Sequence, residues 1–170
     1  LMLSDIGSVG FKVENFSKPN MDILEENWQQ MRSSLLLAVR LLASFGFNAQ
    51  NLRADSAILP IAYYLHFRKL DAGYLSRSEH AKDRSSLRHW LVKSLLKASG
   101  IWGSGLDTLL TVLRKAIVEH GQFEFPVQQV ESNMSSRGKS LSFTDEEIDE
   151  LSTLEYGNKR TFALLSIVFP

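Results

Sequence analysis

The feature that most constrains the fold is a series of apolar residues that recur in steps of three and four. The series comprises Met21, Leu24, Trp28, Met31, Leu35, Ala38, Leu42 and Phe45. Such steps place side chains on one face of an α-helix, so the spacing predicts one helix from Asn20 to Phe45, ended by Gly46. We expect this face to pack along a partner helix in the core. An intermolecular coiled coil is the alternative.

Helical patterns continue along the rest of the chain. They cover residues 56–70, 83–99, 104–120, 126–134, 144–154 and 161–169. Asp83 is expected to cap one helix and Ser104 with Asp107 another, while Thr144 with Glu147 has the spacing of a capping box. The sequence therefore predicts an all-α fold, an irregular bundle of about six helices. Residues 1–19 would form an N-terminal arm or entry segment with at most a short strand, and residues 20–170 the helical domain.

Two of these helices have informative faces. Apolar side chains surround most of the segment 56–70, which predicts a helix buried at the centre of the fold. In the segment 83–99, a stripe of Leu87, Leu91, Leu95 and Ala98 is expected to face the core. A row of His89, Lys93 and Lys97 would then lie on the opposite, solvent-facing side.

Composition excludes several classes of protein. The chain has 170 residues, no cysteine, and 19 basic against 19 acidic residues. The absence of cysteine excludes disulfides and thiolate metal sites, and it fits a reducing, cytoplasmic setting. Balanced charge gives no overall field that would attract a nucleic acid. No apolar run reaches the length of about 18 residues that a membrane span needs, so we expect no membrane partner.

No motif for catalysis, cofactor or metal is complete. The run Arg137-Gly138-Lys139-Ser140 resembles the end of a phosphate-binding loop, but Asn133 stands where that loop needs its first glycine. Gly103-Ser104-Gly105 before a helix could present amides to an anion, although connector glycines are commoner. The four histidines lack metal-ligand spacing. We therefore expect no catalytic residues, no metal and no cofactor.

Basic residues are the remaining candidates for a functional surface. They occur on three predicted helices or their ends: Arg88, His89, Lys93 and Lys97, then Arg114 and Lys115, and finally Lys159 and Arg160. If these side chains converged, they would form a patch suited to DNA phosphates. The alternative is that each belongs to an ordinary solvated helix face.

Four runs of residues resemble one known family. They are Ile61-Ala62-Tyr63-Tyr64-Leu65, Gly103-Ser104-Gly105-Leu106-Asp107-Thr108-Leu109 followed by Arg114-Lys115, Phe143-Thr144-Asp145-Glu146-Glu147-Ile148-Asp149-Glu150-Leu151, and Tyr156-Gly157-Asn158-Lys159-Arg160-Thr161-Phe162. Together they resemble the helical region of domain-of-unknown-function family 262, ParB-like proteins related to the GmrSD modification-dependent restriction systems. The resemblance spans about residues 15–170 in colinear order.

The resemblance implies a protein with several parts. In the family, a ParB-like domain with an Asp-Gly-Gln-Gln-Arg motif handles nucleotide, and a His-Asn-His nuclease module often follows the helical region. Neither motif occurs in this chain. We therefore expect a non-catalytic domain that couples nucleotide and nuclease modules and contacts DNA weakly. A protein-interaction module that mediates oligomerisation is the alternative.

Overall fold

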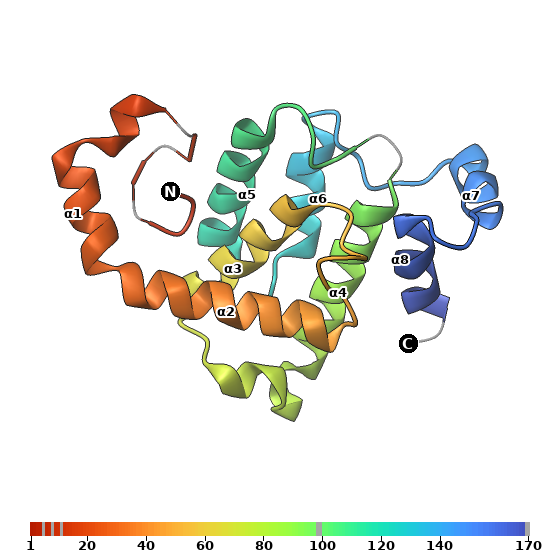
Figure 1. The fold of residues 1–170 in the computed structure, drawn as a ribbon, viewed down its shortest axis with the longest axis horizontal. Helices are drawn as coiled ribbons and strands as arrows, with labels where there is room; N and C mark the ends of the chain where they lie inside the picture. Colours follow the sequence, from red (N-terminus) through yellow and green to blue (C-terminus); the bar gives the residue numbers. More distant parts are fainter. Residues whose placement is uncertain (5, 8, 11, 98–99, 169–170) are drawn as a thin grey trace.

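The computed structural model describes residues 1–4, 6–7, 9–10, 12–97 and 100–168, and all regular secondary structure among these residues is helical, without a strand. The α-helices are α1 (Lys18–Glu26), α2 (Trp28–Ser44), α3 (Ile58–Phe67), α4 (Ala81–Leu96), α5 (Leu106–His120), α6 (Val127–Ser135), α7 (Asp145–Ser152) and α8 (Lys159–Val168). Four short 3-10 helices accompany them: η1 (Val13–Phe16), η2 (Asp55–Ala57), η3 (Ala72–Leu75) and η4 (Ser78–His80). The predicted all-α class is confirmed, and Figure 1 shows the arrangement.

The prediction of about six helices was too low, mainly because the first predicted helix is two helices. The chain turns at Asn27, whose side-chain amide donates to the carbonyl oxygen of Ile23 at 2.9 Å. An asparagine that bonds its own backbone in this way competes with the regular helix pattern. α1 therefore leaves the line of α2 and folds back toward the arm (Figure 1). Ala98 and Phe169, which the sequence placed in helices, lie outside the described residues.

α3 is the centre of the fold, as its apolar circumference predicted. Ile61, Ala62, Tyr64 and Leu65 are completely buried. α2 packs against one side of α3 and α5 against another. Pro60 lies in the first turn of α3, where a helix does not need its missing N–H group. Burial on all sides makes α3 the element that positions its neighbours.

Asp83 does not cap a helix, and this prediction was wrong. It lies in the first turn of α4 but points inward, with only 6% of its surface exposed. Its carboxylate accepts hydrogen bonds from the Tyr64 hydroxyl at 2.6 Å, the Tyr74 hydroxyl at 2.9 Å and the Phe125 amide at 2.7 Å. These partners outweigh capping because a buried carboxylate must be fully hydrogen-bonded. Asp83 thereby joins α3, η3, α4 and the segment before α6.

Other predicted helix ends had mixed outcomes. Thr144 and Glu147 form the predicted capping box at the start of α7. The predicted cap from Ser104 is absent, because α5 begins after Gly105, which has a left-handed backbone and provides no side chain.

At the other end of the fold, Phe162 of α8 packs edge-on against Phe47 with ring centroids 5.3 Å apart. This contact seats α8 near the end of α2.

The N-terminal arm is packed rather than extended. Met2, Leu3, Ile6 and Val9 are all buried. Arg114 of α5 holds the arm, donating to the carbonyl oxygen of Ile6 at 2.8 Å. The arm therefore forms one side of the helical domain (Figure 1).

Replacing Asp83 by alanine should greatly reduce stability. The Tyr64 and Tyr74 hydroxyls and the Phe125 amide would lose their common acceptor inside the core. Each buried group left unsatisfied costs about 1–3 kcal/mol, so we expect the free energy of unfolding to fall by about 3 kcal/mol or more. Urea denaturation measures this change. Glu79→Ala, at an exposed acidic residue nearby, is the matched control, and equal small effects of both substitutions would contradict the role of Asp83.

Stability should also fall at alkaline pH. Burial, together with the Asp83 carboxylate, raises the pKa of Tyr64 and of Tyr74. The folded state therefore resists ionisation that the unfolded chain undergoes near pH of about 10. The stabilisation is complete below that pH and is lost above it, by up to about 1.4 kcal/mol per pH unit for each tyrosine. Urea denaturation at several pH values across this range measures the effect. The double variant Tyr64→Phe/Tyr74→Phe should show a weaker dependence of the free energy of unfolding on pH. Tyr156→Phe, which replaces a fully exposed tyrosine, should match the wild type.

Candidate functional site

The basic row of α4 is largely engaged within the protein. Lys93 Nζ lies 2.6 Å from a carboxylate oxygen of Glu131 on α6. Lys97, just beyond α4, is 7% exposed rather than solvent-facing, so its predicted place on a solvated face was wrong. His89 remains exposed, with Nδ1 2.7 Å from the carbonyl oxygen of Ser85. The row therefore connects α4 to its neighbours more than it faces solvent.

Lys97 anchors α7. Its ammonium group lies 2.6 and 2.7 Å from the two carboxylate oxygens of Glu147 and donates to the carbonyl oxygen of Ser142 at 2.8 Å. It also lies 5.0 Å from the centre of the Phe143 ring, within cation–π range. The hydrogen bond from Lys97 and the amide of Thr144 hold the pKa of Glu147 below its usual range. Lys97 is thus occupied by a structural ion pair.

The other basic candidates also have partners, with one exception. Arg88 donates to the carbonyl oxygen of Ser166 at 2.5 Å, and Arg160 pairs with Glu150 at 2.6 Å. Lys115 forms a longer, exposed ion pair with Glu119 at 3.8 Å. Lys159 is exposed and has no ion pair with a described residue. Arg114, as noted, holds the arm.

These candidates do not gather on one helix or at one helix junction. Figure 1 shows α5 and α8 on opposite sides of α4. The basic candidates that remain accessible, His89, Lys115 and Lys159, come from three different helices. The accessible basic candidates are therefore single residues on separate helices.

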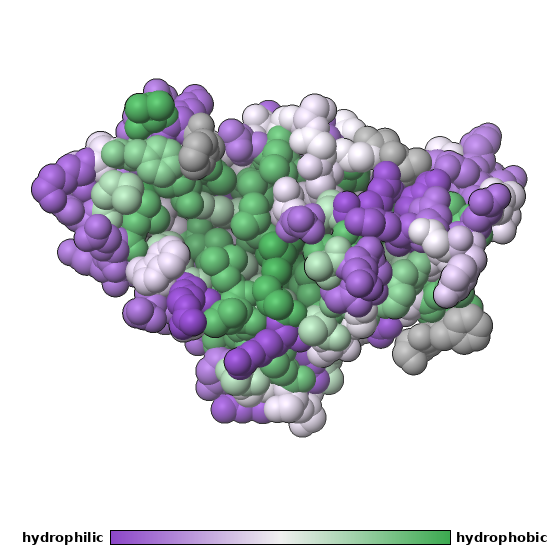
Figure 2. Space-filling view, viewed as in Figure 1, coloured by the Kyte–Doolittle hydropathy of each residue, from purple (hydrophilic) through white to green (hydrophobic). Residues whose placement is uncertain are grey.

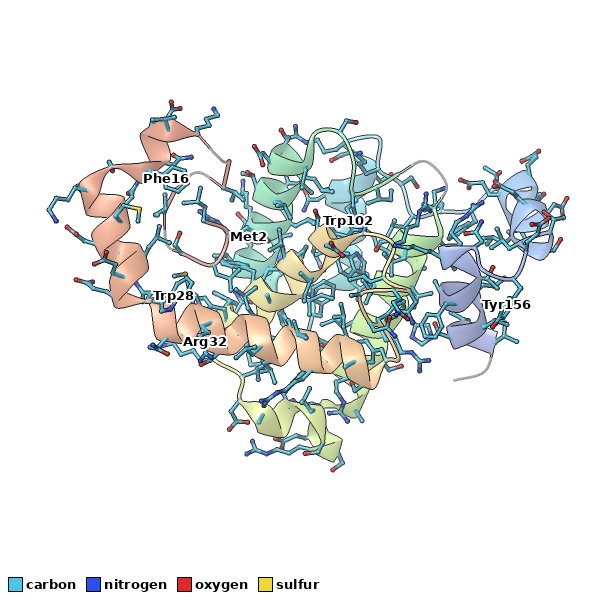
Figure 3. The ribbon with its side chains drawn as sticks, viewed as in Figure 1. Met2, Phe16, Trp28, Arg32, Trp102 and Tyr156 are labelled. Carbon is cyan, nitrogen blue, oxygen red and sulfur yellow. The ribbon has the colours of Figure 1, made fainter. Side chains whose placement is uncertain are left out.

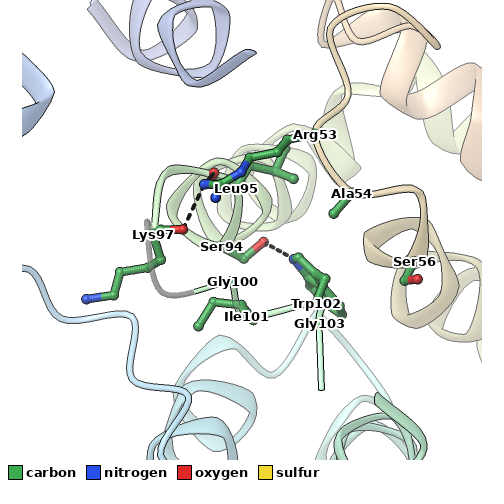
Figure 4. A pocket seen from close by; sticks show the side chains of 10 residues that line it. All are labelled: Arg53, Ala54, Ser56, Ser94, Leu95, Lys97, Gly100, Ile101, Trp102 and Gly103. Carbon is green, nitrogen blue, oxygen red and sulfur yellow. Dashed lines mark hydrogen bonds between the residues drawn. The ribbon is translucent and has the colours of Figure 1, made fainter. Parts of the chain in front are cut away.

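A small polar hollow lies beside the glycine-containing connector that follows α4. It has a volume of about 270 Å³ and is lined by Arg53, Ser94, Trp102 and Gly103 among others (Figure 4). Arg53 donates to the carbonyl oxygens of Leu95 and Lys97 at 3.1 and 2.8 Å, and the Trp102 indole donates to Ser94 Oγ at 3.1 Å. These bonds satisfy the end of α4, so the polar groups here have a structural use.

No described residues form a metal site or a membrane span. Among the described side chains, no three of His, Cys, Asp or Glu come together as a metal-binding group. Within the described ranges, every helix is too short or too polar to cross a bilayer.

An accessible apolar feature follows α1 and α2. Three hollows of about 300, 340 and 350 Å³ are lined by residues of α1 and α2, and the first two share Leu24 and Trp28. Leu35 lines the second hollow, and Val39, one helical turn later on α2, lines the third. We call this feature the α2 furrow. One wall is formed by Trp28, Leu35 and Val39, and the opposite wall by Ile58, Leu59 and Leu106.

The wall on α2 is unusually exposed for its chemistry. Trp28 is 57% exposed and Val39 is 52% exposed. Figure 2 shows apolar side chains gathered between the arm, α2 and α5, and Figure 3 shows Trp28 at the start of α2. A contiguous apolar surface of this kind typically marks a place where another molecule binds.

The furrow was only partly visible in the sequence. The series from Met21 to Phe45 contains both buried residues that line the furrow, such as Met31, and exposed ones, such as Trp28. The sequence indicated the furrow only through the length of the apolar series, which is longer than one partner helix covers. Ile58, Leu59 and Leu106 could not be assigned to the furrow, because their meeting with α2 depends on tertiary packing.

Comparisons with known proteins identify no relative. No protein-family model matches the chain, and no curated protein sequence is significantly similar to it. The family resemblance described above accordingly depends on the four runs of residues that carry it.

Proposed function

We propose that this chain is a non-catalytic helical domain that binds a helix of another protein module in the α2 furrow. The observation that carries the proposal is the apolar wall of Trp28, Leu35 and Val39, in which Trp28 and Val39 are exposed, together with the second apolar wall of the furrow. Burying apolar surface is the main source of protein–protein affinity. Aromatic residues such as Trp28 are also enriched among the side chains that dominate binding energy.

The shape of the furrow suits an amphipathic helix. The segment from Trp28 to Val39 is helical and about 17 Å long, because each helical residue adds about 1.5 Å. A second helix laid beside it would place its apolar side chains every three or four residues into the hollows. An extended strand would fit less well, since no described segment offers an open sheet edge.

The family resemblance gives this binding a context. We propose that the bound module belongs to a ParB-like, modification-dependent restriction or defence protein in the cytoplasm, a nucleotide-dependent nuclease as a whole. The helical domain would hold the nucleotide and nuclease modules in place. Homo-oligomerisation, in which a second copy supplies the helix, is the alternative occupant.

A neutral amphipathic peptide should bind the furrow. The probe is a helical peptide of about 16 residues with a leucine face and uncharged remaining positions, long enough to form a helix. Trp28 is 57% exposed, whereas Trp90 and Trp102 are 1% and 9% exposed, so a blue shift in tryptophan emission on binding reports Trp28. We expect a Kd in the range of about 1–100 μM.

Val39→Glu should weaken this binding about tenfold or more, because it places a charge against apolar surface. Val118→Glu is the matched control, as Val118 is 42% exposed on α5 and lines none of the three hollows. The absence of any emission shift with wild-type protein would contradict a docking role for the furrow.

Weak DNA contact is a second proposal, carried by the exposed Lys115 and Lys159. We expect weak binding to duplex DNA that falls as salt rises, without cleavage of DNA or hydrolysis of nucleotide. Lys115→Glu/Lys159→Glu should weaken binding and reduce the slope of log affinity against log salt by about 1 for each DNA phosphate that a lysine no longer neutralises. Lys97 is unsuitable for this test because its substitution would disturb α7.

Lys12→Glu/Lys18→Glu, at two exposed lysines of the N-terminal region, changes net charge by the same amount and is the control in the same titration. Unchanged DNA affinity in the double variant would contradict this contact. Metal-dependent cleavage by the purified chain would contradict the non-catalytic proposal.

A further inference from the structure

Three cations from distant parts of the chain lie close together beyond the end of α4. Arg53, which precedes η2, donates to the carbonyl oxygen of Lys97 at 2.8 Å, and Lys97 directly follows α4. Burial, and then the positive charge of Arg160 in the first turn of α8, lower the pKa of Arg53. We call Arg53, Lys97 and Arg160 the basic cluster. Because neighbouring like charges repel, such a cluster is stable only with negative charge beside it.

Two carboxylates of α7 provide this negative charge. Glu147 lies 2.6 and 2.7 Å from the Lys97 ammonium group, and Glu150 lies 2.6 Å from the Arg160 guanidinium group. Residues three apart on a helix are neighbours on its surface, with about 5–6 Å between their Cβ atoms. The two cations that these carboxylates hold are therefore neighbours as well.

α7 has few other contacts to hold it in place. None of its eight residues is buried, although Leu151 is partly buried against the core. Figure 1 shows α7 at the edge of the molecule, beyond α8. A helix of this length is marginal in water by itself, and poorly buried elements open more readily than the core. The two ion pairs are thus the main attachment of α7.

The carboxylates of α7 occupy positions that phosphate groups would take. Lysine and arginine form the same charge-assisted hydrogen bonds with phosphate as with carboxylate. DNA carries one phosphate per about 3.4 Å of axis along each strand, so adjacent phosphates could engage neighbouring cations. Lys159, which we proposed above to contact DNA, is adjacent to Arg160 in the chain and exposed. DNA bound at Lys159 would therefore lie next to the covered cluster.

We infer that α7 is an autoinhibitory helix that covers a binding site for phosphates of the DNA backbone. While α7 is attached, Glu147 and Glu150 neutralise the basic cluster. When α7 detaches, Lys97 and Arg160 can bind adjacent phosphates beside Arg53. DNA and α7 compete, so the affinity for DNA is reduced in proportion to the fraction of molecules in which α7 is detached. This inference rests on the proposed DNA contact and identifies a second, covered part of its site.

Weakening the attachment of α7 should strengthen DNA binding. Glu147→Gln/Glu150→Gln removes both negative charges, while glutamine at position 147 can still complete the capping box with Thr144. Fluorescence anisotropy with a short labelled duplex should show binding about tenfold tighter than that of the wild type. The slope of log affinity against log salt should become steeper by about 2, because two more phosphates are neutralised.

Asp145→Asn/Asp149→Asn is the matched control. Both aspartates are exposed on α7 and form no ion pair with a described residue. This variant changes net charge equally but leaves both attachments intact. Its affinity for DNA should rise by about twofold at most, because salt screens exposed charges that do not contact the ligand. Urea denaturation checks that the core of each variant is folded.

Hydrogen exchange of the wild-type protein provides a test that needs no variant. Saturating DNA should accelerate exchange of the α7 amides about tenfold or more, because bound DNA keeps α7 detached. The α7 amides of Glu147→Gln/Glu150→Gln should exchange rapidly without DNA. The amides of α3 should remain protected in every case.

The outcomes separate this inference from the proposed DNA contact. If the wild type binds DNA but both double variants bind it equally tightly, autoinhibition by α7 is overturned while the DNA contact stands. Unchanged α7 exchange in the DNA-bound wild type also overturns autoinhibition. If neither the wild type nor Glu147→Gln/Glu150→Gln binds DNA, the DNA contact fails and the covered phosphate site fails with it.

Discussion

The buried carboxylate of Asp83 is the interaction on which the arrangement of the helices depends. Moving a carboxylate out of water costs several kcal/mol unless hydrogen bonds replace its hydration. Here the replacement comes from Tyr64, Tyr74 and the backbone of Phe125, which belong to three other segments. The carboxylate of Asp83 has all of its hydrogen bonds only when all of these segments are in place. The same contact therefore selects one packing of α3 and α4 over looser alternatives.

The position of α3 in turn produces the α2 furrow. α2 and α5 both pack on α3, but the break at Asn27 directs α1 away from the line of α2. The apolar side chains at the start of α2 consequently have no helix over them, and the arm covers only part of the space. An exposed tryptophan at this junction is a consequence of the turn at Asn27.

Local patterns in the sequence predicted local structure well. The all-α class, the central position of residues 56–70 and the capping box at Thr144 all follow from spacing within a few residues. Asp83 was misassigned because its sequence context is that of a helix cap, while its partners are distant along the chain. Lys97 was misassigned for the same reason, since Glu147 lies 50 residues away. The candidate site depends on such distant meetings, so the sequence indicated only that Trp28 and Leu35 share one apolar helix face, which was expected to lie in the core.

The N-terminal arm has a thermodynamic consequence for any molecule in the furrow. Leu3 and Val9 of the arm line the same hollow as Leu59 of α3 and Leu110 of α5, so the hollow exists only when segments from across the first two thirds of the chain are assembled. A ligand that binds such a composite surface binds the folded state and not the unfolded chain. Occupancy therefore raises the stability of the whole domain by an amount that grows with the logarithm of ligand concentration. Binding and folding of this chain are linked through the N-terminal arm, which Arg114 holds in place.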